Sequence, residues 1–278
     1  NRKRIKKQKI EKKFTQLKSD YIKKNLPFQL TESQKNVLSE INKDLSSKKR
    51  MFRIVQGDVG SGKTIVSLLA ISNIIESGYQ CALMGPTGIL AKQHYELAKK
   101  IFKDVNFKIN FLTGKTEANN RKEILNKLET GKTDLLIGTH ALFQKKINFK
   151  KLGLVIIDEQ HKFGVKQRSE LAKKGGDNCD VLLMSATPIP RTMMMSLYGD
   201  MDISKITEKP AKRKSIITLS KPEKKISELW SYIKKQIDDQ NQIFWVCPLI
   251  NESSFLDYSS AKKKFDFINK KFPNKVGL

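Results

Sequence analysis

A stretch from Gln56 to Thr64, QGDVGSGKT, combines glycines with a lysine and a hydroxyl residue at a spacing that suits phosphate binding. Its glycines let the backbone curl so that N–H groups converge, and a helix starting there adds the positive end of its dipole. Lys63 would reach the outer phosphates, and Thr64 would offer its hydroxyl to Mg²⁺. An ordinary glycine-rich turn is the alternative. The nucleotide-binding candidates are Gly57, Asp58, Val59, Gly60, Ser61, Gly62, Lys63 and Thr64.

Two acids at the end of an apolar run form the second group that could do chemistry. Asp158 and Glu159 directly follow the run 154–157. Asp158 can hold Mg²⁺, and Glu159 can orient and activate an attacking water. A pair of surface acids is the alternative, but together with the phosphate loop the pair predicts ATP hydrolysis. His161 is either a structural histidine or a sensor of the nucleotide, and the candidate catalytic residues are Lys63, Asp158, Glu159 and His161.

Gln34 is a candidate for reading the adenine base. It lies in the first turn of a helix expected from Glu32 to Leu45, with Thr31 as its N-cap. A glutamine amide has the donor and acceptor that an adenine edge requires, although an exposed helix position is the alternative. Phe28, shortly before this helix, is a further candidate for the nucleotide pocket.

Small hydroxyl residues and glycines end several other apolar runs. Ser185, Ala186 and Thr187 could hydrogen-bond toward the acids and toward a facing domain, and so couple the two. Loops at 85–88, 112–116 and 138–140 offer N–H groups and hydroxyls that suit nucleic-acid phosphates rather than bases, and ordinary turns are the alternative. The candidate DNA contacts in these loops are Pro86, Thr87, Thr113, Gly114, Thr139 and His140.

Alternating strands and helices must position these residues. Short apolar runs separated by helical patterns predict an α/β fold with a parallel sheet sandwiched by helices, with the functional loops at the carboxyl ends of the strands. The expected strands are 51–56, 80–85, 108–112, 134–138, 153–158 and 181–185. The expected helices are 63–77, 88–103, 117–129 and 165–174.

The chain divides into three expected parts. Residues 1–24 are predicted to form a basic connecting helix, and residues 25–209 the nucleotide-binding domain. Residues 210–278 are expected to begin a second α/β domain, with strands 216–219 and 242–247 and helices 223–240 and 258–271. Two strands are too few for a complete sheet, so we expect the chain to be truncated.

Composition narrows the function classes. The net charge of +26 over 278 residues favours a polyanionic partner such as nucleic acid, although a genome-wide bias toward lysine would also produce it. Three scattered cysteines argue against a zinc site or a disulfide framework and fit a reducing cytosol. The absence of a long apolar run or a secretory signal predicts a cytoplasmic protein without a membrane partner.

The motifs together resemble one family of enzymes. Gln34, GDVGSGKT, PTGILAKQH, GTHALFQ, DEQHKFGVKQR, SATPIPRT and CPLINES occur in the order and spacing of the superfamily-two DNA translocases. They are most similar to those of the RecG-type ATP-dependent DNA helicases, from about residue 26 to about residue 257. The resemblance implies two RecA-like domains with ATP and Mg²⁺ as cofactors, and it adds Gln160 and Arg191 to the coupling residues. Gly88 and Ser185 depart from the usual acid and threonine.

The family resemblance also implies a function. Its members remodel stalled replication forks and Holliday junctions in recombination and repair, by driving duplex DNA against a wedge domain. We therefore expect branched DNA as partner, a monomeric state and a bacterial, nucleoid-associated location. A transcription-repair coupling translocase and a nucleic-acid-binding module without full activity are the alternatives. Because the wedge and the later motifs are not in the chain, we expect it to bind nucleotide but to hydrolyse it poorly.

Overall fold

The computed structural model describes residues 8–144, 146–159, 176–187, 201–208, 216–220, 222, 226–249 and 260–278, except for the side chain of Phe143. The chain divides into two compact units, residues 1–213 and residues 214–278. Each unit is described by itself. The candidate site lies in the first.

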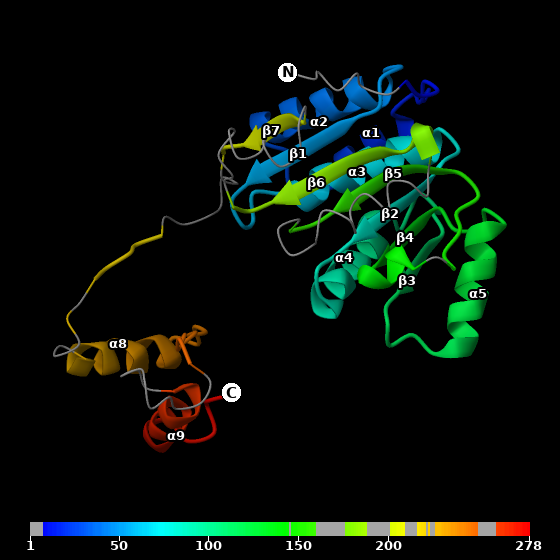
Figure 1. Cartoon of the computed structure of the whole chain (residues 1–278). Helices are drawn as coiled ribbons and strands as arrows, with labels where there is room; N and C mark the ends of the chain where they lie inside the picture. The colour runs from blue at the N-terminus through cyan, green and yellow to red at the C-terminus, as the bar shows by residue number, and fades with distance from the viewer. Residues whose placement is uncertain are drawn as a thin grey trace, which may run out of the picture. The chain divides into compact units, whose positions relative to one another are not determined.

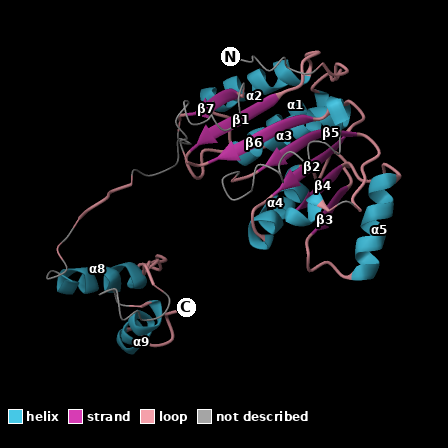
Figure 2. Ribbon diagram, viewed as in Figure 1, coloured by secondary structure: helices cyan, strands magenta, loops and turns pink. Residues whose placement is uncertain are grey.

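A parallel sheet forms the centre of the first unit (Figures 1 and 2). Its strand order is β3-β4-β2-β5-β6-β1-β7, and every paired strand runs parallel to its neighbour. The strands are β1 Phe52–Gly57, β2 Gln80–Met84, β3 Ile109–Leu112, β4 Leu135–Gly138, β5 Leu152–Ile157, β6 Asp180–Ser185 and β7 Asp202–Ile206. Since all the strands are parallel, their carboxyl ends meet at one edge.

Helices cover both faces of this sheet, because alternate strand residues point to opposite sides. On β5, Leu154 and Ile156 join the core beneath α1, α2 and α3, whereas Val155 and Ile157 join the core beneath α5. The helices of the first unit are α1 Leu17–Lys24, α2 Glu32–Leu45, α3 Lys63–Glu76, α4 Gly88–Ile101 and α5 Ala118–Glu129, with a 3-10 turn η1 at His140–Phe143.

The sequence-based expectation of an α/β parallel sheet is confirmed, with six of its seven strands at the predicted places. The seventh, β7, was missed because its sequence DISKI contains only two apolar residues, which are not adjacent. It adds to the outer side of β1, where Arg53 on β1 donates to Ser204 at 2.7 Å and pairs with Glu40 and Asp44 of α2. The expected helix 165–174 lies outside the described residues.

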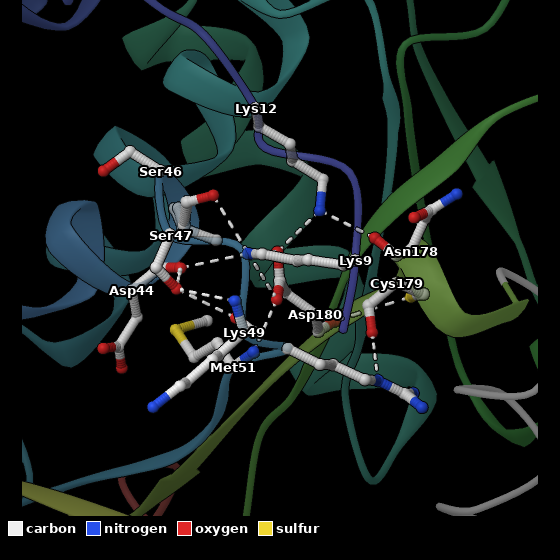
Figure 3. A network of polar contacts seen from close by, with 12 residues as sticks. Lys9, Lys12, Asp44, Ser46, Ser47, Lys49, Met51, Asn178, Cys179 and Asp180 are labelled. Carbon is white, nitrogen blue, oxygen red and sulfur yellow. Dashed lines mark hydrogen bonds and ion pairs between the residues drawn. The ribbon is translucent and has the colours of Figure 1, made fainter. Parts of the chain in front are cut away.

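The prediction that residues 1–24 form a helix was wrong for residues 9–16, which form no helix, and residues 1–7 lie outside the described part. Specific polar contacts prevail over the helical spacing here (Figure 3). Lys9 Nζ donates to both carboxylate oxygens of Asp180 at 2.8 and 2.7 Å, and Lys12 Nζ donates to Asp180 at 2.6 Å. All three side chains are fully buried.

The surroundings of Asp180 complete this cluster. Lys9 also donates to the backbone carbonyls of Asp44 and Leu45, and the N–H of Met51 donates to Asp180 at 2.7 Å. Burial lowers the pKa of Lys9, Asp180 opposes that shift, and Lys12 adds to it. We call residues 8–16 the N-terminal strap, because they cross the amino ends of β1 and β6 and are fixed there.

A carboxylate on α3 caps the short helix α1 that follows the strap. The N-cap residue Gln16 has a left-handed φ of 64° and no capping side-chain bond of its own. Glu76 supplies the acceptor instead: it accepts from the N–H of Thr15 at 2.7 Å and from the N–H of Lys18 at 3.4 Å, and also from the Thr15 hydroxyl. The cap is therefore tertiary, which explains why sequence spacing misplaced the start of the helix.

The second unit contains helices α8 Ile226–Asp238 and α9 Ala261–Lys271. The expected strands 216–219 and 242–247 were wrong, since those residues form no strand in the described structure. Strands need neighbours to satisfy their backbone groups, and no strand of this unit is described. Instead, Trp245 stacks on Trp230 at 5.3 Å between ring centroids. That the unit begins a second RecA-like domain stays a prediction.

The cysteines of the described residues form no disulfide, and none of the described helices could span a membrane. Cys81 and Cys179 are buried thiols, and Cys247 is partly exposed and unpaired. Burial raises the pKa of Cys179 to about 12 and that of Cys81 well above its ordinary value, so both remain protonated. No described helix has both the length and the apolar character needed to cross a bilayer.

Candidate nucleotide and nucleic-acid site

The carboxyl edge of the sheet brings the candidate residues together in two groups. Because the strand order is β3-β4-β2-β5-β6-β1-β7, the ends of β5, β6 and β1 are neighbours and carry Asp158, Ser185 and the loop 57–64. The ends of β3, β4 and β2 form the other half and carry the loops proposed to contact DNA. The two halves meet where β2 pairs with β5.

The phosphate loop takes the shape that its glycines permit. Gly60 and Gly62 have φ of 76° and 89°, in the left-handed region that favours glycine. A Cβ at Gly62 would lie 2.3 Å from Gln34 Nε2, and one at Gly57 would lie 2.6 Å from Ser61 Oγ. The loop is therefore closed around atoms that leave no space for side chains at these two positions. Helix α3 starts directly after it, at Lys63.

Gln34 holds the loop through its amide. It is buried, its Nε2 donates to the backbone carbonyl of Ser61 at 2.7 Å, and its Oε1 accepts from the N–H of Thr31 at 3.0 Å. The Thr31 hydroxyl accepts from the N–H of Gln34 in turn, which completes a capping box at the start of α2. Gln34 thus joins the start of α2 to the phosphate loop. Its role as reader of adenine stays a prediction.

Lys63 lies inside the loop with its ammonium group held by backbone carbonyls. Its Nζ donates to the carbonyls of Gly57 at 2.6 Å and Asp58 at 3.0 Å. Burial lowers the pKa of Lys63, and the negative charges of Glu159, Asp158 and Asp58 oppose that shift. A cation held among carbonyls in a partly desolvated loop is suited to exchange them for phosphate oxygens.

A histidine that the sequence analysis did not single out holds Asp158. His94 Nε2 lies 2.8 Å from Asp158 Oδ2, and both residues are buried. The other oxygen, Oδ1, accepts from the N–H of Glu159 at 3.0 Å, and Glu159 itself has a φ of 47°. His94 lies on the buried face of α4, at the end of the PTGILAKQH motif, and no pattern in the sequence marks it as a partner of Asp158.

Ser185 and Thr187 form a turn that closes on itself at the end of β6. The Ser185 hydroxyl lies 3.0 Å from that of Thr187 and accepts from the N–H of Thr187 at 3.2 Å. Ser185 is fully buried and pairs in register with Gln56, the residue before the phosphate loop. The predicted coupling residues Ser185, Ala186 and Thr187 thus neighbour the nucleotide loop.

Backbone hydrogen bonds connect the three candidate DNA loops to Asp158. The N–H of Thr139 donates to Leu112 at 3.4 Å, that of Gly85 donates to Gly138 at 2.9 Å, and that of Asp158 donates to Met84 at 2.9 Å. The loops at the ends of β3, β4 and β2 are therefore connected, one to the next, to Asp158 at the end of β5. Thr87 caps α4 by accepting from the N–H of Leu90, and Thr113 accepts from the N–H of Lys115.

Some of the remaining candidates are exposed, and others lie outside the described residues. Phe28 is half exposed and Val59 is 71% exposed at the loop tip. Pro86, Gly114 and His140 sit at the same carboxyl edge as the other loop residues. Gln160, His161 and Arg191 lie outside the described residues. The candidate site therefore stands on the residues before Gln160 and on the turn at the end of β6.

The residues present suit a nucleotide with its metal. Ser61 Oγ is buried and has no hydrogen-bond partner in the described structure, beside a loop that a Cβ would fill. No three His, Cys, Asp or Glu side chains gather as a metal cluster within the part that the structure describes. Mg²⁺ takes few protein ligands and completes its shell with phosphates and water. Lys63 would hold the phosphates, and Thr64 and Asp158 would hold the metal.

The parallel sheet and the loop that follows β1 define a protein of the RecA-like, phosphate-loop class. The DEAD/DEAH box helicase family model matches residues 31–196. The chain therefore belongs to the DEAD/DEAH box helicase family.

The similarity to individual relatives extends over more of the chain than the family match does. The chain is 46% identical over 92% of its length to the ATP-dependent DNA helicase RecG of Thermotoga maritima, and equally so to that of Bacillus subtilis. It covers 33% and 38% of those two proteins, so it spans about a third of their length. The resemblance to RecG-type helicases is confirmed.

A solved structure gives the same result. The chain aligns with a structure of RecG bound to a three-way DNA junction, with a TM-score of 0.80 and 38% identity, over 95% of this chain and 34% of that one. An RNA helicase from Sulfolobus tokodaii aligns with a TM-score of 0.51 at 20% identity and shares the fold. The RecA-like architecture predicted from the sequence is thereby confirmed.

Proposed function

We propose that this chain is the ATP-binding motor part of a bacterial DNA helicase that moves along duplex DNA and remodels branched DNA in recombination and repair. One observation carries the proposal most directly. The phosphate loop and Asp158 lie on the half of the sheet edge that meets the hydroxyl-rich loops, and backbone hydrogen bonds tie those loops to Asp158 in sequence. A translocase requires such a connection between the site that hydrolyses ATP and the loops that bind DNA.

The chemistry assigned to the site is hydrolysis of the terminal phosphate of ATP. Lys63 binds the outer phosphate oxygens in exchange for the carbonyls of Gly57 and Asp58. Thr64 and Asp158 would hold Mg²⁺, which would neutralise charge on the phosphates. Glu159, next to Asp158 on a backbone with positive φ, orients a water and accepts its proton.

The proposed contacts with DNA do not depend on its base sequence. Thr87, Thr113 and Thr139 would bind DNA phosphates through hydroxyl and backbone N–H groups, supported by the strongly basic composition. Branched duplex DNA is the proposed partner, because one relative has been solved in complex with a three-way DNA junction. We propose further that the protein acts as a monomer in the bacterial cytoplasm, at the nucleoid.

The test has two parts. The first measures binding of a fluorescent, non-hydrolysable ATP analogue with Mg²⁺ by the 278-residue chain, and Lys63→Ala should weaken it by about 100-fold, because a charge-assisted contact to phosphate is removed. Equal binding by wild type and variant would contradict the assignment of the loop.

The second part measures ATP turnover by the same chain with and without three-way-junction DNA. We expect slow turnover, since a finger arginine from elsewhere can supply about 10³–10⁵ in rate in related phosphate-loop enzymes. Robust, DNA-independent turnover by the chain alone would contradict this expectation.

A further inference from the structure

Asp158 is connected to the DNA side of the sheet edge by a side chain as well as by backbone. His94 Nε2 lies 2.8 Å from Asp158 Oδ2. A carboxylate can only accept, so the imidazole Nε2 carries the hydrogen and donates. His94 is 8% exposed and Asp158 is 9% exposed, so little water competes for this bond.

The helix that carries His94 is joined to a candidate DNA loop at its first turn. Thr87 caps α4, and the N–H of Ala91 donates to the Thr87 carbonyl at 2.9 Å. A Cβ at Gly85 would lie 2.9 Å from the backbone nitrogen of Ala91, so loop and helix touch backbone to backbone. The loop 85–87 and the first turns of α4 therefore form one packed piece.

The spacing along α4 allows this packed piece to carry a shift of the loop 85–87 to His94. His94 follows Thr87 by two helical turns, about 10 Å along the axis at 1.5 Å per residue. Ala91 and Ala98, one turn on either side of His94, are both fully buried against the sheet. A shift of the loop on binding a phosphate would thus reach His94 as movement of a stiff element.

We propose that His94 is a positioning residue that orients the Asp158 carboxylate for Mg²⁺ and transmits the state of the DNA loop at 85–87 to the nucleotide site. This inference rests on the proposed function, because it needs Asp158 to hold the metal. Outer hydrogen-bond partners of a metal ligand contribute about 10- to 100-fold in metal affinity or activity. His94 and the 85–87 loop connect the two halves of the edge at the β2–β5 boundary.

The experiment measures binding of a fluorescent, non-hydrolysable ATP analogue over a series of Mg²⁺ concentrations, with and without three-way-junction DNA. His94→Phe keeps a buried ring but removes the donor, and it should raise the half-saturating Mg²⁺ concentration about 10-fold or more. It should leave Mg²⁺-free binding of the analogue unchanged. His94→Gln presents its own Nε2 donor and should stay within about 3-fold of wild type on both measures. Glu96→Gln, exposed on the same helix, is the matched control.

The DNA arm tests transmission by linkage. Whatever factor the junction DNA produces in the nucleotide affinity of wild type should shrink toward one in His94→Phe and return in His94→Gln. A His94→Phe variant with wild-type Mg²⁺ dependence and wild-type linkage would overturn the proposal. So would a folded His94→Gln variant that loses Mg²⁺ dependence, which also decides the matter if His94→Phe does not fold. Failure of wild type to bind the nucleotide would instead contradict the proposed function.

Discussion

At the scale of single residues, the nucleotide loop depends on glycine for two separable reasons. Gly62 has a left-handed φ of 89°, and its Cβ position lies 2.3 Å from Gln34 Nε2. Gly78, after α3, has a similar φ of 74° but nothing within 4 Å of its Cβ position. An alanine at position 78 would therefore introduce backbone strain alone. An alanine at position 62 would introduce both backbone strain and a collision with Gln34.

This pair yields a prediction with an internal control. Gly78→Ala should cost about 1 kcal/mol of unfolding free energy and leave nucleotide affinity unchanged. Gly62→Ala should cost more, because Gln34 must give up its bond to Ser61, and should weaken binding of an ATP analogue by at least about tenfold. Urea unfolding and fluorescence titration measure the two quantities, and equal effects at both glycines would contradict the collision.

At the scale of elements, α1 depends on a carboxylate from another helix. Burial acts to raise the pKa of Glu76, but the hydrogen bonds from Thr15 and Lys18 outweigh it and lower the pKa below its ordinary value. Because this pKa is lower in the folded protein than in the unfolded chain, its contribution to stability is fully present above the ordinary carboxyl pKa. It is lost as the pH falls through the lowered value.

Amide hydrogen exchange can follow this cap directly. Protection of the first amides of α1 should fall as the pH drops below the ordinary carboxyl range, while protection in β5 stays high. Glu76→Gln should weaken that protection at neutral pH and remove the step. A variant that keeps the acid-dependent step would show that another group caps the helix.

Prediction from sequence succeeded where one local pattern decides the element. The positions of six strands follow from apolar runs that leave few alternatives, and the left-handed φ of Gly60 and Gly62 follows from the glycine spacing of the loop. It failed where a distant partner decides. Residues 9–16 have helical spacing, but Asp180 fixes Lys9 and Lys12 in an extended segment from more than 160 positions away. The strands expected at 216–219 and 242–247 have suitable residues but no described partner strand.

The site shows the same division. Lys63 and Asp158 were singled out because the roles predicted for them depend on neighbours in sequence, and those roles stay predictions. His94 was missed because its role depends on packing α4 against the end of β5, and a lone histidine on a helix carries no such signal. The hold of Gln34 on the phosphate loop likewise depends on α2 meeting that loop, which spacing does not specify.

At the scale of the whole molecule, the cluster around Asp180 joins the N-terminal strap to the sheet. Two buried ammonium groups share one buried carboxylate there. Asp180→Asn keeps the shape but removes the negative charge that is paired with both lysines. We expect a loss of about 3–5 kcal/mol in unfolding free energy, because buried cations are left uncompensated.

A surface pair serves as the comparison. Asp20→Asn breaks the exposed ion pair with Lys23 and should cost no more than about 0.5 kcal/mol. Combining Asp180→Leu with Lys9→Met and Lys12→Met should recover most of the loss, since apolar replacement of a buried ion cluster is often neutral. Urea unfolding distinguishes these outcomes, and a loss at Asp180 as small as that at Asp20 would contradict the importance of the cluster.

The same cluster has a mechanical consequence. Asp180 is the first residue of β6 and Ser185 is the last, so a pull applied to the N-terminal strap would enter the sheet in line with the strand that ends beside the phosphate loop. Parallel neighbours β1 and β5 would oppose that pull in shear, through hydrogen bonds along the whole strand. In an optical-trap experiment, tension on the strap would therefore be borne by β6, whose last residue pairs in register with the residue before the phosphate loop.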